Sequence, residues 1–128
     1  MSLLLDTHIL VWISAASHRL PPDVRRRLEA REETLVFSVA SLWEVAIKNS
    51  LGRGNFPVKG ADLRRGLLAR RYEELPVTGP HALETAALPA IHRDPFDRIL
   101  VAQARCEGLT LLTADRRVAR YPGPIELV

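Results

Sequence analysis

Cysteine is almost absent from this chain of 128 residues, because Cys106 is its single example. One thiol excludes an intrachain disulfide, and it falls within an apolar helical pattern that does not suit a catalytic nucleophile. The four histidines lack the spacing of a zinc site and have no cysteine pair to complete one. The first residues also lack a secretory signal pattern, so we expect a cytoplasmic protein.

Long apolar runs and a glycine-rich phosphate loop are missing too. No apolar stretch approaches the roughly 18 residues that cross a bilayer. Gly52 and Gly54 precede no helix that opens with a Lys-Ser or Lys-Thr pair, which excludes a phosphate-binding loop. With 47% hydrophobic and 26% charged residues, the composition is that of a globular protein, and one domain over residues 1–128 is expected.

Lysine is scarce, because Lys48 and Lys59 are the only two among 18 basic residues and the other 16 are arginines. The arginines cluster at residues 25–27, 64–65, 70–71 and 116–117. A guanidinium group binds phosphate with a flat fork of donors, so a basic surface would suit a polyanionic substrate. The alternative is that these arginines only solvate the outer faces of helices, in a genome whose GC content favours arginine codons.

Short apolar runs alternate with helical patterns along the chain. Strands are expected at 3–5, 35–37, 75–77, 110–112 and 125–128. Helices are expected at 7–16, 21–31, 39–51, 61–71, 80–88 and 95–107, with a loop at 52–60. Ser38 is a good N-cap, Asp94-Pro95 a good helix start and Gly108 a good helix end. This alternation predicts a mostly parallel sheet covered by helices on both faces, with Trp12 and Trp43 in the core.

Four acidic residues adjoin the most apolar segments: Asp6, Glu44, Asp97 and Asp115. Asp6 and Asp115 come just after expected strands, and ligands of parallel sheets bind beyond the carboxyl ends of strands. A carboxylate is costly to desolvate without a positive partner. We therefore expect the four to meet around a divalent metal ion.

Two of these acids have simpler explanations that stay open. Asp6 could cap the helix that begins at Thr7, and Asp115 could cap a short final helix. Thr113 could bond a metal-bound water, or only its own backbone.

The other two acids have alternatives as well. Glu44 could complete a capping box with Ser41 or pair with Lys48 one turn away, although its apolar neighbours favour burial. Asp97 could simply interact favourably with the helix dipole near the start of its helix. Because capping accounts fully for Asp94, Asp97 is the better candidate for a metal ligand.

Four blocks of the sequence resemble PIN-domain proteins, and specifically the VapC toxins of bacterial and archaeal toxin–antitoxin pairs. The blocks are residues 4–8 (LLDTH), 41–48 (SLWEVAIK), 94–98 (DPFDR) and 112–115 (LTAD), in that order. The similarity covers nearly the whole chain, including residues 75–78, 81–82 and 121–122.

The resemblance implies a parallel α/β/α sandwich and a magnesium-dependent endoribonuclease with Mg²⁺ or Mn²⁺ as cofactor. Its acidic quartet falls on Asp6, Glu44, Asp97 and Asp115, with Asp6 and Asp97 as direct metal ligands. It also implies a homodimer and a cognate VapB-like antitoxin, whose C-terminal segment occupies a groove of the toxin. RNA is the implied substrate.

Other acidic α/β proteins fit less well. A receiver domain needs another acid near the first strand and a late lysine, and a haloacid-dehalogenase-type phosphatase needs Asp-x-Asp, where this chain has His8. The remaining alternative is a PIN-like module that binds RNA or a partner without cutting. Arg98 and Arg116 adjoin the acids and are expected to grip flanking phosphates.

Overall fold

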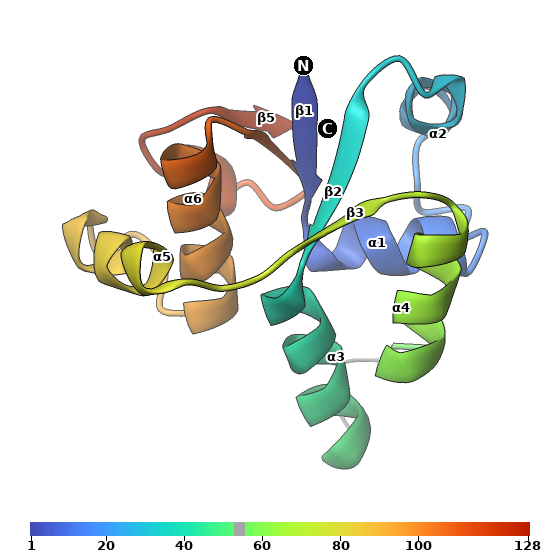
Figure 1. The fold of residues 1–128 in the computed structure, drawn as a ribbon, viewed down its shortest axis with the longest axis horizontal. Helices are drawn as coiled ribbons and strands as arrows, with labels where there is room; N and C mark the ends of the chain where they lie inside the picture. Colours follow the sequence, from blue (N-terminus) through green and yellow to red (C-terminus); the bar gives the residue numbers. More distant parts are fainter. Residues whose placement is uncertain (53–55) are drawn as a thin grey trace.

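The computed structural model describes residues 1–52 and 56–128 of the chain. Strands and helices alternate along it (Figure 1). The strands are β1 (Ser2–Leu5), β2 (Thr34–Ser38), β3 (Glu73–Leu75), β4 (Thr110–Thr113) and β5 (Ile125–Leu127). The α-helices are α1 (Thr7–Ser14), α2 (Pro22–Ala30), α3 (Val39–Ser50), α4 (Gly60–Ala69), α5 (Gly79–Glu84) and α6 (Pro95–Glu107). Two short 3-10 helices are η1 (Thr85–Ala87) and η2 (Val118–Arg120).

The strands form one sheet in the order β3-β2-β1-β4-β5, and every neighbouring pair is parallel. The central strand β1 places Leu4 beside Val36 of β2 and Leu111 of β4. All three side chains are buried, as expected for a parallel sheet with both faces covered. The expectation of a mostly parallel sheet is therefore confirmed.

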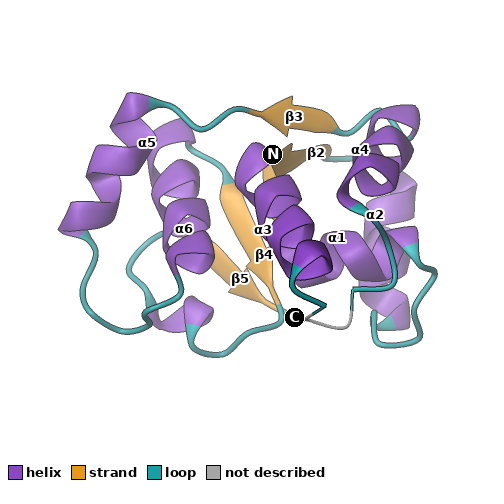
Figure 2. Ribbon diagram, turned by 90° about the horizontal axis from the view of Figure 1, so that it is seen from below, coloured by secondary structure: helices purple, strands orange, loops and turns teal. Residues whose placement is uncertain are grey.

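Alternate residues of β1 build two separate cores. Leu3 and Leu5 pack on one face with residues of α1, α2 and α4, including Ile9 and Leu63. Leu4 packs on the other face with α6. Figure 2 shows the sheet between α5 and α6 on one side and α1, α2 and α4 on the other. This is the three-layer α/β/α sandwich that the resemblance implies.

Local capping signals place the helix ends. The Ser38 hydroxyl accepts a hydrogen bond from the Ala40 amide at 3.0 Å, which begins α3 directly after β2. Gly108 adopts φ 67° after α6, a left-handed conformation that glycine tolerates without steric cost. The first of these turns leads from β2 directly into α3, and the second leads from α6 to β4.

Several boundaries differ from the expected ones. The third strand ends at Leu75, because Pro76 has no amide hydrogen to continue the ladder. The helix expected over 80–88 ends at Glu84 and continues as a 3-10 turn. Of the loop expected over 52–60, residues 53–55 lie outside the described residues. None of the helices in the described ranges is long and apolar enough to span a membrane.

The two tryptophans have different environments. Trp12 is partly buried and packs against the core, as expected. Trp43 is 63% exposed, so its placement in the core was wrong. The helical pattern of α3 identifies an apolar face but does not show what covers that face. Trp43 instead meets Phe96 edge to face, with ring centroids 5.3 Å apart, at the surface between α3 and α6.

Candidate active site

Asp6 lies at the carboxyl edge of the sheet, immediately after β1. Its amide continues the ladder by donating to the Leu112 carbonyl at 3.0 Å, and the residue is only 4% exposed. Oδ1 accepts a hydrogen bond from the His8 amide at 2.8 Å, and Oδ2 accepts one from the Thr113 hydroxyl at 2.6 Å. Asp6 therefore caps α1, which confirms the first interpretation of this residue, and its role as a metal ligand at the strand end stays a prediction.

Asp115 reaches the same edge after β4. Its amide donates to the Thr113 hydroxyl at 3.1 Å, and its Oδ1 accepts from the Arg117 amide at 2.8 Å. Asp6 and Asp115 line one pocket of about 330 Å³. Thr113 thus joins the two acids through one hydroxyl group, which donates to the Asp6 carboxylate and accepts the local backbone bond from the Asp115 amide that the sequence left open.

Glu44 extends from the second turn of α3 and is 2% exposed. Its Oε2 lies 2.6 Å from the Lys48 ammonium group, so both the expected burial and the pairing one turn away are confirmed. The capping box with Ser41 is wrong, because Ser38 is the cap and the Ser41 hydroxyl accepts a bond from Thr7 at 2.9 Å. Among the described residues, Oε1 of Glu44 is buried without a hydrogen-bond partner.

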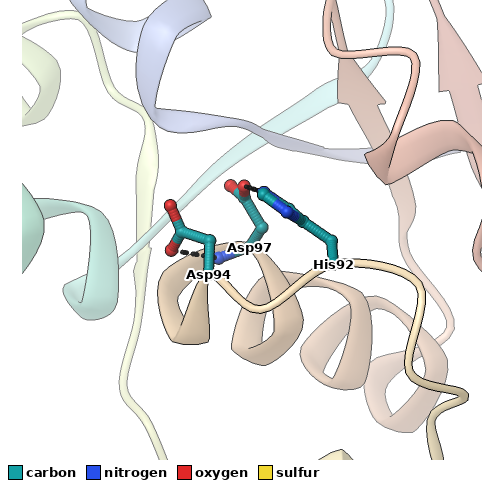
Figure 3. Close-up of side chains that lie close together, drawn as sticks. All are labelled: His92, Asp94 and Asp97. Atoms are coloured by element: carbon teal, nitrogen blue, oxygen red, sulfur yellow. Dashed lines mark hydrogen bonds and ion pairs between the residues drawn. The ribbon is translucent and has the colours of Figure 1, made fainter.

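Asp97 lies in the first turn of α6, where Asp94 is the cap (Figure 3). Oδ1 of Asp94 accepts hydrogen bonds from the Phe96 amide at 2.8 Å and the Asp97 amide at 3.4 Å. Oδ2 of Asp97 lies 2.9 Å from Nε2 of His92, and Figure 3 shows the two side chains meeting above the helix start. His92, Asp94 and Asp97 each offer a ligand atom within 4.8 Å of the others.

His92 is a site residue that sequence reasoning missed. Its imidazole reaches Asp97, and its main chain is held by the Tyr121 hydroxyl, which accepts from the His92 amide at 2.9 Å and donates to its carbonyl at 2.8 Å. The spacing of a zinc site does not identify a single histidine beside carboxylates. The available signal was proximity in sequence, since His92 stands two residues before the capping Asp94.

Mutual repulsion marks the acids as one electrostatic group. Burial is the largest cause that raises the pKa of Asp97 to about 8, and the charges of Asp94, Asp6, Glu44 and Asp115 contribute the rest in that order. Burial also raises the pKa of Asp6, against the hydrogen bond from Thr113 and the positive charge of His8. The fold therefore gathers the four expected acids and adds Asp94.

The donor set fits a hard divalent cation. It consists almost wholly of carboxylate oxygens, which Mg²⁺ and Mn²⁺ prefer, together with one imidazole. Two features of the chain leave room for a cation. The buried Oε1 of Glu44 has no hydrogen-bond partner in the described part, and burial together with the neighbouring acids raises the pKa of Asp97 to about 8. The tight group around Asp97 contains His92 and Asp94 rather than Asp6, whose two oxygens already accept hydrogen bonds.

The two arginines next to the acids have different roles. Arg98 donates to three main-chain carbonyls within residues 85–89 and to the Tyr121 hydroxyl, so it ties the preceding loop to α6. The expectation that Arg98 grips phosphate is therefore wrong. Arg116 is exposed and lines the same pocket as Asp6 and Asp115, where it remains available to an anion.

Comparison with known proteins agrees with this architecture. The PIN domain family model matches residues 3–124. Ribonuclease VapC22 of Mycobacterium tuberculosis is 30% identical over 127 residues, which are 97% of this chain and 96% of that protein. Two solved structures share the fold: VapBC2 from Rickettsia felis bound to a promoter DNA fragment (TM-score 0.72, 20% identity, 99% and 98% of the two chains) and DNA-bound VapBC from Salmonella typhimurium (0.71, 21%, 98% and 97%). The chain therefore belongs to the PIN domain family.

Proposed function

We propose that this chain is a metal-dependent endoribonuclease that hydrolyses RNA phosphodiesters and acts as the toxin of a VapBC-type pair. The observation that supports this proposal is that the charges of Asp6, Glu44 and Asp115 act on Asp97, and that Asp6 and Asp115 share one pocket. The end-to-end similarity to Ribonuclease VapC22 supports RNA as the substrate. The likeness to VapBC complexes, which show the fold, is consistent with a VapB-like antitoxin as the partner.

Asp6 and Asp97 would hold Mg²⁺ or Mn²⁺, with Glu44 and Asp115 holding a second ion or orienting water. A divalent cation at this position would act as a Lewis acid: it would lower the pKa of a bound water and offset the negative charge that develops on the phosphate. The closely spaced acids give the site the negative charge that would attract such a cation. Asp97 would be ionised beside such a cation, because a nearby positive charge lowers a carboxyl pKa.

The remaining residues of the site position these groups. Thr113 fixes the carboxylate of Asp6, and His92 fixes that of Asp97. The free Oε1 of Glu44 is the buried acceptor best suited to orient the attacking water. Arg116 would bind a phosphate flanking the one that is cut, since it is exposed beside Asp115.

We also infer a homodimer that forms through the apolar face of α3 and α5. Trp43 is 63% exposed, Leu83 78% and Val77 42%. An apolar pocket of about 500 Å³ between these segments includes Trp43, Val77 and Phe96. Contiguous exposed apolar surface of this kind is typical of a protein interface.

Cleavage of a panel of structured RNAs by the purified chain, with and without Mg²⁺ or Mn²⁺, tests the proposal. We expect metal-dependent products from the wild type and none from Asp6→Asn or Asp97→Asn. Asp62→Asn is the matched control, because Asp62 is an exposed acid on α4 paired with Arg65. Fully active Asp6→Asn would refute the assignment, and RNA binding without any products would favour the alternative of a non-cutting PIN-like module.

A further inference from the structure

Three ring side chains gather beside the acidic site, and the catalytic proposal gives them no role. The exposed His8 lies two residues after Asp6, and its ring centroid is 6.1 Å from that of Trp12 and 5.4 Å from that of Phe56. His8 and Trp12 are one turn apart on α1, so they lie on one helix face. Phe56 comes from the segment before α4 and completes the group.

The rings differ in how firmly they are held. Trp12 and Phe56 are partly buried and pack against the core on the α1 face of the sheet. His8 is exposed, and its amide donates to Oδ1 of Asp6. These three residues, called the aromatic wall below, are held by the core through Trp12 and Phe56 and reach solvent at His8. The His8 ring is inclined by 56° to that of Trp12 and by 57° to that of Phe56.

Three cationic side chains lie near the aromatic wall. The Lys48 ammonium group lies 5.2 Å from the Phe56 ring centroid, in a cation–π contact. Arg116 shares the pocket of about 330 Å³ that is lined by Asp6, His8 and Trp12. Arg19 lines an adjoining pocket of about 220 Å³ that also includes the three rings. Arg19 and Arg116 therefore adjoin the rings through the two pockets, while Lys48 also pairs with Glu44.

We propose that His8, Trp12 and Phe56 form a subsite that stacks an unpaired nucleobase of a single-stranded RNA, beside the acidic site and at the pocket that Arg116 also lines. This inference rests on the proposed function, because RNA is taken as the ligand. Unstacked bases bind aromatic faces while cations contact the neighbouring phosphates, and the mixture of rings and cations here fits that mode of recognition. A base paired in a duplex presents no free face, so the subsite selects single-stranded segments.

Binding can be measured without cleavage. In the Asp97→Asn background with EDTA, fluorescence anisotropy of a short labelled single-stranded RNA gives its affinity. We expect His8→Ala and Phe56→Ala each to weaken binding about fivefold or more. His18→Ala and Leu51→Ala are matched controls, since both residues are exposed and neither lines the two pockets. They should bind like the parent.

Phe56→Leu separates stacking from packing, because leucine keeps apolar volume against the core but has no aromatic face. It should weaken binding as Phe56→Ala does while retaining the parent's melting temperature. The same strand annealed to its complement should bind more weakly and be insensitive to all of these changes. Unchanged affinity in His8→Ala and Phe56→Ala would overturn the proposal and leave the wall to a protein partner.

Abasic substitutions along the strand locate the stacked base. At one position, removal of the base should weaken binding to the parent and make His8→Ala and Phe56→Ala cause no further loss. Equal losses on every abasic strand would overturn the stacking interpretation. A parent protein that does not bind the single strand would overturn it outright, whereas binding through these rings by a chain that never cleaves RNA contradicts only the nuclease assignment.

Discussion

The hydroxyl of Thr113 donates a 2.6 Å hydrogen bond to Oδ2 of Asp6, and so joins the ends of β4 and β1 across 107 positions of sequence. Both residues are buried. The bond favours the ionised carboxylate and thus opposes the burial that raises the pKa of Asp6. A side chain outside the acidic quartet therefore contributes directly to the charge state of the quartet.

Replacement of this hydroxyl by a methyl group should destabilise the protein. In Thr113→Val, the buried carboxylate of Asp6 loses a donor, at a cost of about 1.5–3 kcal/mol at neutral pH. Thr113→Ser keeps the donor and should recover most of the loss. Thr110→Val, at the opposite end of β4, is the control and should change stability by less than about 0.5 kcal/mol. Urea unfolding in EDTA measures all three, and equal stability of Thr113→Val and wild type would contradict the argument.

Asp97 makes stability depend on pH in the metal-free protein. Its folded pKa of about 8 lies above the ordinary 3.8, so the folded state binds more protons than the unfolded state between these values. The stability that this proton provides is complete at pH below 3.8 and is lost as pH rises through about 8. The loss should amount to a few kcal/mol, on the order of 1.4 kcal/mol per unit of pKa difference and shared among the coupled acids.

Asp97→Asn should flatten this dependence, because the amide is neutral throughout. The variant should be more stable than the wild type above pH 8 in EDTA and lose the gain when Mg²⁺ is added to both. Chemical unfolding across the pH range provides the measurement, with Asp62→Asn as the control on an exposed acid. If the stability of the wild type rises between neutral pH and pH 9, protonation of Asp97 does not stabilise the folded state.

The positions of the acids were predictable because strand ends and helix starts determine them. Asp6 and Asp115 follow short apolar runs that predict buried strands, and Asp97 follows the capping Asp94 and Pro95. The carboxyl ends of parallel strands share an edge, so the strand pattern predicts that Asp6 and Asp115 lie close together. The wholly parallel order of the sheet agrees with the alternation of strand and helix patterns in the same way.

Other features depend on tertiary contacts that no local pattern specifies. His92 reaches Asp97 because Tyr121, 29 residues later, holds its main chain. Arg98 was expected at the phosphate because it follows Asp97, but the carbonyls of the preceding loop capture it. Trp43 lies on an apolar helix face, and periodicity does not distinguish burial within the chain from burial against another molecule.

His92 should matter for metal binding, through the orientation of Asp97. Groups that hydrogen-bond a metal ligand typically change affinity by about 10- to 100-fold when removed. We expect His92→Ala to weaken Mn²⁺ binding within that range and Tyr121→Phe to weaken it less, since the imidazole remains. Isothermal titration with Mn²⁺ measures both, with His18→Ala as the control. Unaltered Mn²⁺ affinity in His92→Ala would show that Asp97 needs no such support.

The exposed Trp43 provides the test of the inferred homodimer. A buried tryptophan at an interface centre contributes about 2 kcal/mol or more, so Trp43→Lys should raise the dimer dissociation constant by at least about 30-fold. The folded monomer loses mainly the edge-to-face contact with Phe96, worth about 0.5–1.5 kcal/mol, and should stay folded. Leu51→Lys is the control, because Leu51 is 58% exposed at the end of α3 and does not line the apolar pocket. Sedimentation velocity should therefore find wild type and Leu51→Lys as dimers at a concentration where Trp43→Lys is monomeric. A wild type that sediments as a monomer at all concentrations would leave the exposed face of α3 for the antitoxin.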